Sequence, residues 1–153
     1  RLSNAEDHSW ESFALLSARH PESVICLVSA AAWHGLTMAN PPEVWAAFPY
    51  EASIPRGTDF PIRGFRWRGA PMSAGIEERI ISGTTVRITS KERTVVDLLR
   101  TRNRTGEAEI AIESLRAYLD KGGAIRKLTE MAEALKQSNA LRPFMEAAQG
   151  FRM

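Results

Sequence analysis

The spacing of apolar residues changes along this chain of 153 residues, and the change constrains the fold. Apolar side chains recur every three or four positions within residues 90–104, 106–123 and 124–138. This period is typical of helices that bury one face. Residues 43–49, 62–69 and 76–89 instead read as short strands, the last of them as two, with alternation of apolar and polar residues clearest from Phe65 onward. The sequence therefore predicts an α+β domain.

The expected architecture is a single domain over residues 1–153. Its sheet is small and mostly antiparallel, with about four strands, and Ser82-Gly83 predicts a hairpin between two of them. Helices precede the strands. A C-terminal group of three to four helices follows them, beginning at the capping residue Ser90.

The stretch VICLVSAAAWHGLT, residues 24–37, is a long apolar run that contains Ser29 and ends with His34 and Gly35. Its first half has strand propensity. The three alanines, and the absence of an earlier glycine or proline, favour a buried helix that stops at Gly35.

Ser29 and His34 are the one serine–histidine pair in this run that invites a catalytic interpretation. On a helix they are five positions apart, on diverging faces. A nucleophilic serine needs a strained turn such as G-x-S-x-G, and this turn is missing around Ser29. We interpret Ser29 as a self-satisfied packing residue. His34 then lies at the helix C-terminus, where an imidazolium suits the helix dipole.

Other catalytic and ligand-binding patterns are missing from the sequence. The three histidines are scattered, and no H-x-x-x-H, C-x-x-C or glycine-rich phosphate loop occurs. The E-x-K pair of restriction-type nucleases is missing too. We expect no metal, no cofactor and no enzymatic activity.

Composition limits the expected surroundings of the chain. The single cysteine, Cys26, excludes an intrachain disulfide framework and favours a reducing cytoplasm. No apolar stretch reaches the roughly 18 residues of a membrane helix. The net charge of +2 is weak support for a nucleic-acid partner, because such a surface needs clustered cations.

Charged residues do gather in two segments, residues 63–68 and 91–104. Arg93 and Asp97 lie four positions apart, with Arg100 one turn later, which predicts a half-buried charge ladder holding this helix on the sheet. Further cations either form solvated faces or make a surface that binds phosphate. The candidate phosphate contacts are Arg63, Arg66, Arg68, Lys91, Arg100, Arg102 and Arg104.

Several motifs together resemble the C-terminal domain of the AbiEi antitoxin family. They are SAAAWHGLT with EVW, the hairpin pattern GIEE…I.G..VRI.S, and RTVVD followed by RN..G. The resemblance covers essentially the whole chain and implies a transcriptional regulator of a type IV toxin–antitoxin system, a kind associated with phage defence. It also implies a winged helix-turn-helix domain upstream of residue 1 that reads operator DNA.

The resemblance further implies that this domain assists promoter binding and antitoxicity. The counterpart would be an AbiEii-type nucleotidyltransferase toxin, opposed without the need for a stable complex. An alternative function is a protein-interaction module, which binds a toxin or forms a homodimer through an apolar face of its C-terminal helices. An orphan nuclease or hydrolase is the less favoured alternative.

Overall fold

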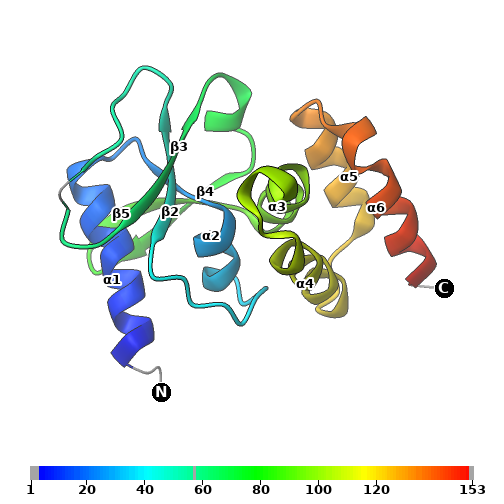
Figure 1. The fold of residues 1–153 in the computed structure, drawn as a ribbon, viewed down its shortest axis with the longest axis horizontal. Helices are drawn as coiled ribbons and strands as arrows, with labels where there is room; N and C mark the ends of the chain where they lie inside the picture. Colours follow the sequence, from blue (N-terminus) through cyan, green and yellow to red (C-terminus); the bar gives the residue numbers. More distant parts are fainter. Residues whose placement is uncertain (1–3, 57, 152–153) are drawn as a thin grey trace.

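The chain has an α+β fold, seen in a computed structural model that describes residues 4–56 and 58–151 (Figure 1). Within this part, side chains are described for residues 10–56, 58–139 and 141–147. The elements are α1 (Asn4–Arg19), β1 (Val24–Ile25), α2 (Leu27–Trp33), β2 (Val44–Pro49), β3 (Ile62–Trp67), the 3-10 helix η1 (Ala70–Met72), β4 (Ile76–Ile81), β5 (Thr84–Thr89), α3 (Lys91–Thr105), α4 (Ala108–Asp120), α5 (Ile125–Ala134) and α6 (Ser138–Phe151).

The strands form one mixed sheet in the order β3-β2-β1-β5-β4. Strand β1 pairs antiparallel with β2, and β4 with β5, as hairpin-rich sheets do. The pairs β2–β3 and β1–β5 are parallel. Among the described residues, the expectation of about four mostly antiparallel strands is therefore corrected to five strands with two parallel pairs. Parallel pairing depends on crossover connections, which leave no short-range mark in a sequence.

The additional strand is β1, which consists of two residues at the centre of the sheet. It occupies the start of the apolar run that we expected to be entirely helical. Val24 and Ile25 are both completely buried. A run that is apolar throughout does not distinguish a buried strand from a buried helix, so periodicity could not locate this boundary. Helix α2 begins only at Leu27 and ends, as expected, just before Gly35, whose φ is +70°.

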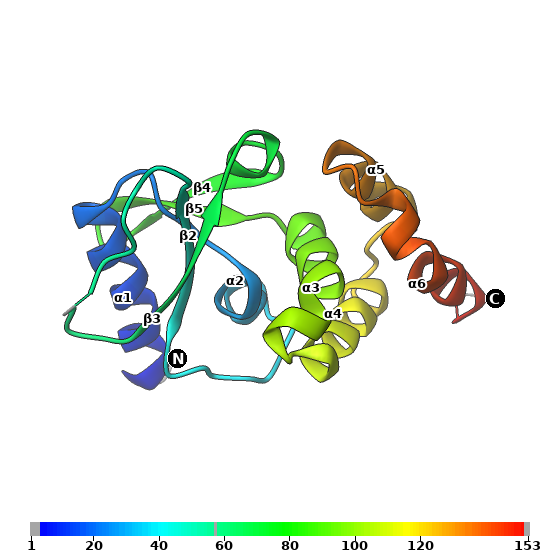
Figure 2. The ribbon, with the colours of Figure 1, turned by 45° about the horizontal axis from the view of Figure 1, so that its top comes forward.

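Two layers of apolar side chains lie on opposite faces of the sheet, and helices cover both faces (Figures 1 and 2). Helix α1 covers one face, which we call the α1 face, and its core includes Phe13, Phe48 and Ile88. Helices α2 and α3 pack on the other, the α3 face, where the core includes Trp45 and Leu99. Helices α4, α5 and α6 lie beyond α3, on the side of the molecule away from α1 (Figure 1).

Several elements begin or end at the residues where local signals in the sequence predict that they do. The Ser90 hydroxyl accepts a hydrogen bond from the Arg93 backbone N–H and so caps α3. Ser82 and Gly83 both have positive φ in the turn between β4 and β5, as a two-residue hairpin requires. In the described part of the chain, no helix has both the length and the apolar character needed to cross a membrane.

Candidate functional site

Ser29 and His34 bond to different parts of the backbone. The Ser29 hydroxyl oxygen accepts a 2.8 Å hydrogen bond from the Trp45 N–H, which ties α2 to β2. Ser29 is therefore satisfied by another element and not by its own helix, which corrects the earlier interpretation. The His34 Nε2 lies 2.7 Å from the Thr89 carbonyl oxygen at the end of β5. Each side chain thus holds α2 against a strand, Ser29 against β2 and His34 against β5. Neither of these hydrogen bonds links Ser29 to His34.

Burial lowers the pKa of His34, and this effect outweighs the bond to the Thr89 carbonyl and the nearby Glu77 carboxylate. A carbonyl oxygen only accepts, so Nε2 carries the hydrogen of a neutral ring. The imidazolium expected at this helix end is disfavoured. The cost of desolvating a charged imidazolium is larger here than its attraction to the helix dipole.

A strained turn does exist in this region, two residues before Ser29. Leu27 has a φ of +52°, a conformation that is rare for a large side chain, at the sharp junction between β1 and α2. Its side chain is buried, as is the preceding Cys26. Burial raises the pKa of the Cys26 thiol, which keeps it in its unreactive protonated form. The turn therefore directs apolar packing and presents no nucleophile.

Arg93 is the centre of a buried polar network on the α3 face. Its side chain is completely buried, and its Nε donates to the Asp97 carboxylate at 2.8 Å. Its Nη1 donates to the carbonyl oxygens of Pro71 and Ala74, at 2.8 and 2.7 Å. The guanidinium carbon lies 4.4 Å from the centre of the Trp67 ring. Arg93 thus fixes the loop between β3 and β4 onto α3.

The charge ladder is more deeply buried than the half-buried one expected, and it carries excess positive charge. Arg100 donates to the other Asp97 oxygen at 3.1 Å, so two guanidinium groups share one carboxylate. The buried Arg93 Nη2 and Arg100 Nε atoms have no hydrogen-bond partner among the described residues. This region therefore has more donors than acceptors, and its local charge favours an anion.

Strand β3 lies against α3 through alternate side chains. Arg63, Phe65 and Trp67 share one face of the strand, because successive residues point to opposite sides. Arg63 stacks on Trp45, with 4.4 Å between the guanidinium carbon and the ring centre, and its Nη2 is 3.5 Å from the Thr105 carbonyl oxygen. One end of β3 therefore meets the start of α3, and the other meets its last turn.

Three arginines lie along this junction, and we call Arg63, Arg100 and Arg104 the arginine row. On α3, Arg100 and Arg104 are seven and eleven residues after Arg93, so all three follow one stripe of the helix. Arg104 is exposed, while Arg63 and Arg100 are partly exposed. Arg63 of the strand thus reaches the last turn of α3, the helix that carries Arg100 and Arg104.

The other arginines of β3 and the loop after it point away from the row. Arg66 follows Phe65 and lies on the opposite face of the strand, where it is exposed. Arg68 stacks on Tyr50, with 3.9 Å between the guanidinium carbon and the ring centre. These two residues border the α1 face.

The remaining candidates also lie elsewhere on α3. Arg102 is on the side of the helix opposite Arg104 and stacks on Phe144 of α6 at 4.4 Å. Lys91 is exposed at the first residue of α3, far along the helix from Arg104. The seven predicted phosphate contacts therefore divide among several surfaces, of which the arginine row joins two elements.

The described residues hold no group of three histidine, cysteine, aspartate or glutamate side chains able to bind a metal ion. Over the described parts of α4 to α6, the one large apolar side chain that is exposed is Ile112, at 37%.

No model of a known protein family matches the chain, and a search of curated proteins finds no significant relative.

Proposed function

We propose that this chain is the non-enzymatic effector domain of an AbiEi-like antitoxin and transcriptional regulator, and that its arginine row contacts the phosphates of promoter DNA. The observation that carries the proposal is the contact of the Arg63 guanidinium with the Thr105 carbonyl oxygen, at the end of α3 where Arg104 lies and on the helix that carries Arg100. Within the described residues, the one carboxylate bonded to the row is that of Asp97, which Arg93 already engages.

The row is suited to phosphate because two of its three side chains, Arg63 and Arg100, are held before any ligand arrives. Arg63 rests on the Trp45 ring, and Arg100 is fixed by Asp97. A guanidinium whose position is already fixed loses less side-chain entropy when it binds an anion. Phosphate contacts of this kind orient a protein on a duplex and carry no base information. An upstream winged helix-turn-helix domain would supply the base contacts to the operator.

The same proposal gives the domain its biological partners. It would act opposite an AbiEii-type nucleotidyltransferase toxin, with homodimerisation as a further possibility to be measured on the whole regulator. The support for this part is the resemblance of the sequence motifs, which the α+β fold accommodates. Co-expression with a neighbouring nucleotidyltransferase gene tests it: loss of toxicity is expected, and undiminished toxicity would contradict an antitoxin role.

The DNA proposal is tested by the salt dependence of binding to a short duplex of random sequence. The double variant Arg63→Gln and Arg104→Gln should reduce the slope of log affinity against log salt by about 1.8, since each phosphate contact contributes about 0.9. The matched control is Arg126→Gln with Arg142→Gln, two exposed arginines of α5 and α6. Equal slopes for the two double variants would remove the row from the proposal.

A further inference from the structure

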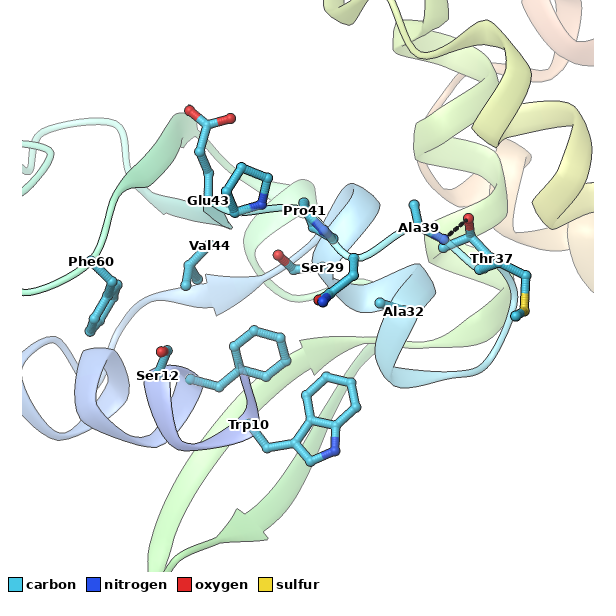
Figure 3. A pocket seen from close by; sticks show the side chains of 14 residues that line it. Trp10, Ser12, Ser29, Ala32, Thr37, Ala39, Pro41, Glu43, Val44 and Phe60 are labelled. Atoms are coloured by element: carbon cyan, nitrogen blue, oxygen red, sulfur yellow. Dashed lines mark hydrogen bonds between the residues drawn. The ribbon is translucent and has the colours of Figure 1, made fainter. Parts of the chain in front are cut away.

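A cavity of about 360 Å³ opens on the α1 face of the sheet, at the end where β2 begins (Figure 3). Four parts of the chain that are distant in sequence surround it: α1, α2, the loop that joins α2 to β2, and the segment before β3. Small-molecule sites span roughly 300–1,000 Å³, so this cavity has room for a compact ligand of one or two rings. It lies on the opposite side of the sheet from the arginine row.

Aromatic and aliphatic side chains form most of the cavity wall. Trp10 and Phe13 of α1 lie side by side, with 5.3 Å between ring centres. Trp33 meets the Trp10 ring edge-on at 5.0 Å and supports it from α2. Ala32 and Phe60 belong to the wall as well. Flat rings in such a wall favour a flat apolar ligand, because offset and edge-on contacts between rings are attractive.

The loop that closes the cavity is held in place in the absence of any ligand. Both oxygens of the Glu113 carboxylate on α4 accept from it, one from the Thr37 hydroxyl at 2.6 Å and one from the Met38 N–H at 2.9 Å. Pro41 and Pro42 stiffen the next part of the loop. A wall that is already ordered makes binding less costly. The Met38 side chain itself is 93% exposed at the rim, where a flexible thioether can cover a ligand.

The charges around the cavity select against anions. Among the described lining residues none is lysine, arginine or histidine, and Glu43 is the one that carries a charge. Figure 3 shows the Glu43 carboxylate pointing away from Trp10. The Ser29 side chain lines the cavity from α2. The Ser29 oxygen already accepts from Trp45, which leaves its hydrogen free to donate.

From these observations we infer that the cavity binds a small, flat, mostly apolar molecule that is neutral or cationic. The ring system occupies the space beside Trp10 and Phe13, and a polar group lies towards Ser29. The inference is independent of the DNA proposal, since it concerns the other face of the sheet and none of the same side chains.

Isothermal titration calorimetry with three probes of one shape and different charge tests the inference on the 153-residue chain. Indole is neutral, tryptamine is cationic and indole-3-acetate is anionic at neutral pH. Indole and tryptamine should bind saturably, and indole-3-acetate should bind at least about tenfold more weakly. Absence of saturable binding by all three probes would overturn the inference, and so would equal binding of the anion.

Two variants locate the binding. Ala32→Leu places a larger side chain in the cavity and should weaken indole binding at least about tenfold, whereas Ala18→Leu, at an exposed position of α1, should not change it. Met38→Ser changes an exposed side chain that the fold does not need, and it should weaken binding a few-fold. Binding that is unchanged in both Ala32→Leu and Met38→Ser would show that the probes bind elsewhere and would overturn the inference.

Discussion

Both faces of the sheet have an apolar core, and they differ in what accompanies it. On the α3 face, Arg93 and Asp97 are completely buried and depend on one another, on carbonyl groups and on the Trp67 ring. On the α1 face, a cavity with mostly apolar walls lies beside the apolar core. A buried polar network tolerates the loss of no member, whereas an apolar wall beside a cavity tolerates added volume. Substitutions in the network or core of the α3 face should therefore lower the free energy of unfolding more than a larger side chain that enters the cavity.

Removal of the Asp97 carboxylate should have the largest effect. Asp97→Ala leaves two guanidinium groups with no buried counter-charge, and the free energy of unfolding should fall by about 3–5 kcal/mol. Urea unfolding measures the loss. The control is Glu130→Ala, which breaks the exposed Arg126–Glu130 pair and should cost no more than about 1 kcal/mol. Similar losses in the two variants would mean that the buried network is not what holds α3.

Two neighbouring alanines of α2 compare the faces more directly. Ala31 is completely buried on the α3 face, whereas Ala32 lines the cavity. Ala31→Leu should reduce the free energy of unfolding by about 1–3 kcal/mol through overpacking. Ala32→Leu should change it by less than about 0.5 kcal/mol, because the new side chain finds open space. Thermal or urea unfolding of both variants checks the difference, which a reversed order would refute.

The pH dependence of stability should report on His34, with a smaller effect. Because burial lowers its pKa in the folded chain, the unfolded chain binds a proton more readily. Stability contributed by neutral His34 is therefore present above about pH 6.5 and is lost as the pH falls below it. His34→Gln keeps a donor for the Thr89 carbonyl and does not titrate. Its unfolding midpoint should fall less than that of the parent between about pH 7 and pH 5; an equal fall would contradict this assignment.

Local sequence signals predicted much of the fold, and their failures have physical causes. Ser90 and Ser82-Gly83 act on their immediate neighbours, so their roles as cap and hairpin turn were readable. Strand β1 was missed because two apolar residues inside an apolar run have no period. The parallel pairs were missed because they depend on contacts between distant segments.

The candidate site was predictable in its parts and not in its arrangement. The spacing of Arg93, Asp97 and Arg100 predicted their ladder correctly. Alternation along β3 separates Arg63 from Arg66, but only the fold shows that Arg63 reaches α3. Arg93 also binds two backbone carbonyl groups, and because every residue has such a group, the sequence does not indicate which ones. The cavity joins four separate segments, and no local pattern could have indicated it.

The most direct test of the account is which face of β3 meets DNA. Two double variants of the chain, Arg63→Gln with Arg104→Gln and Arg66→Gln with Arg68→Gln, remove the same charge from opposite sides of the sheet. Affinity for a duplex of random sequence is measured by fluorescence anisotropy over a series of salt concentrations. We expect the first variant to lose affinity and about 1.8 units of salt slope, and the second to lose much less. A larger loss in the Arg66 and Arg68 variant would contradict the assignment of phosphate binding to the α3 face.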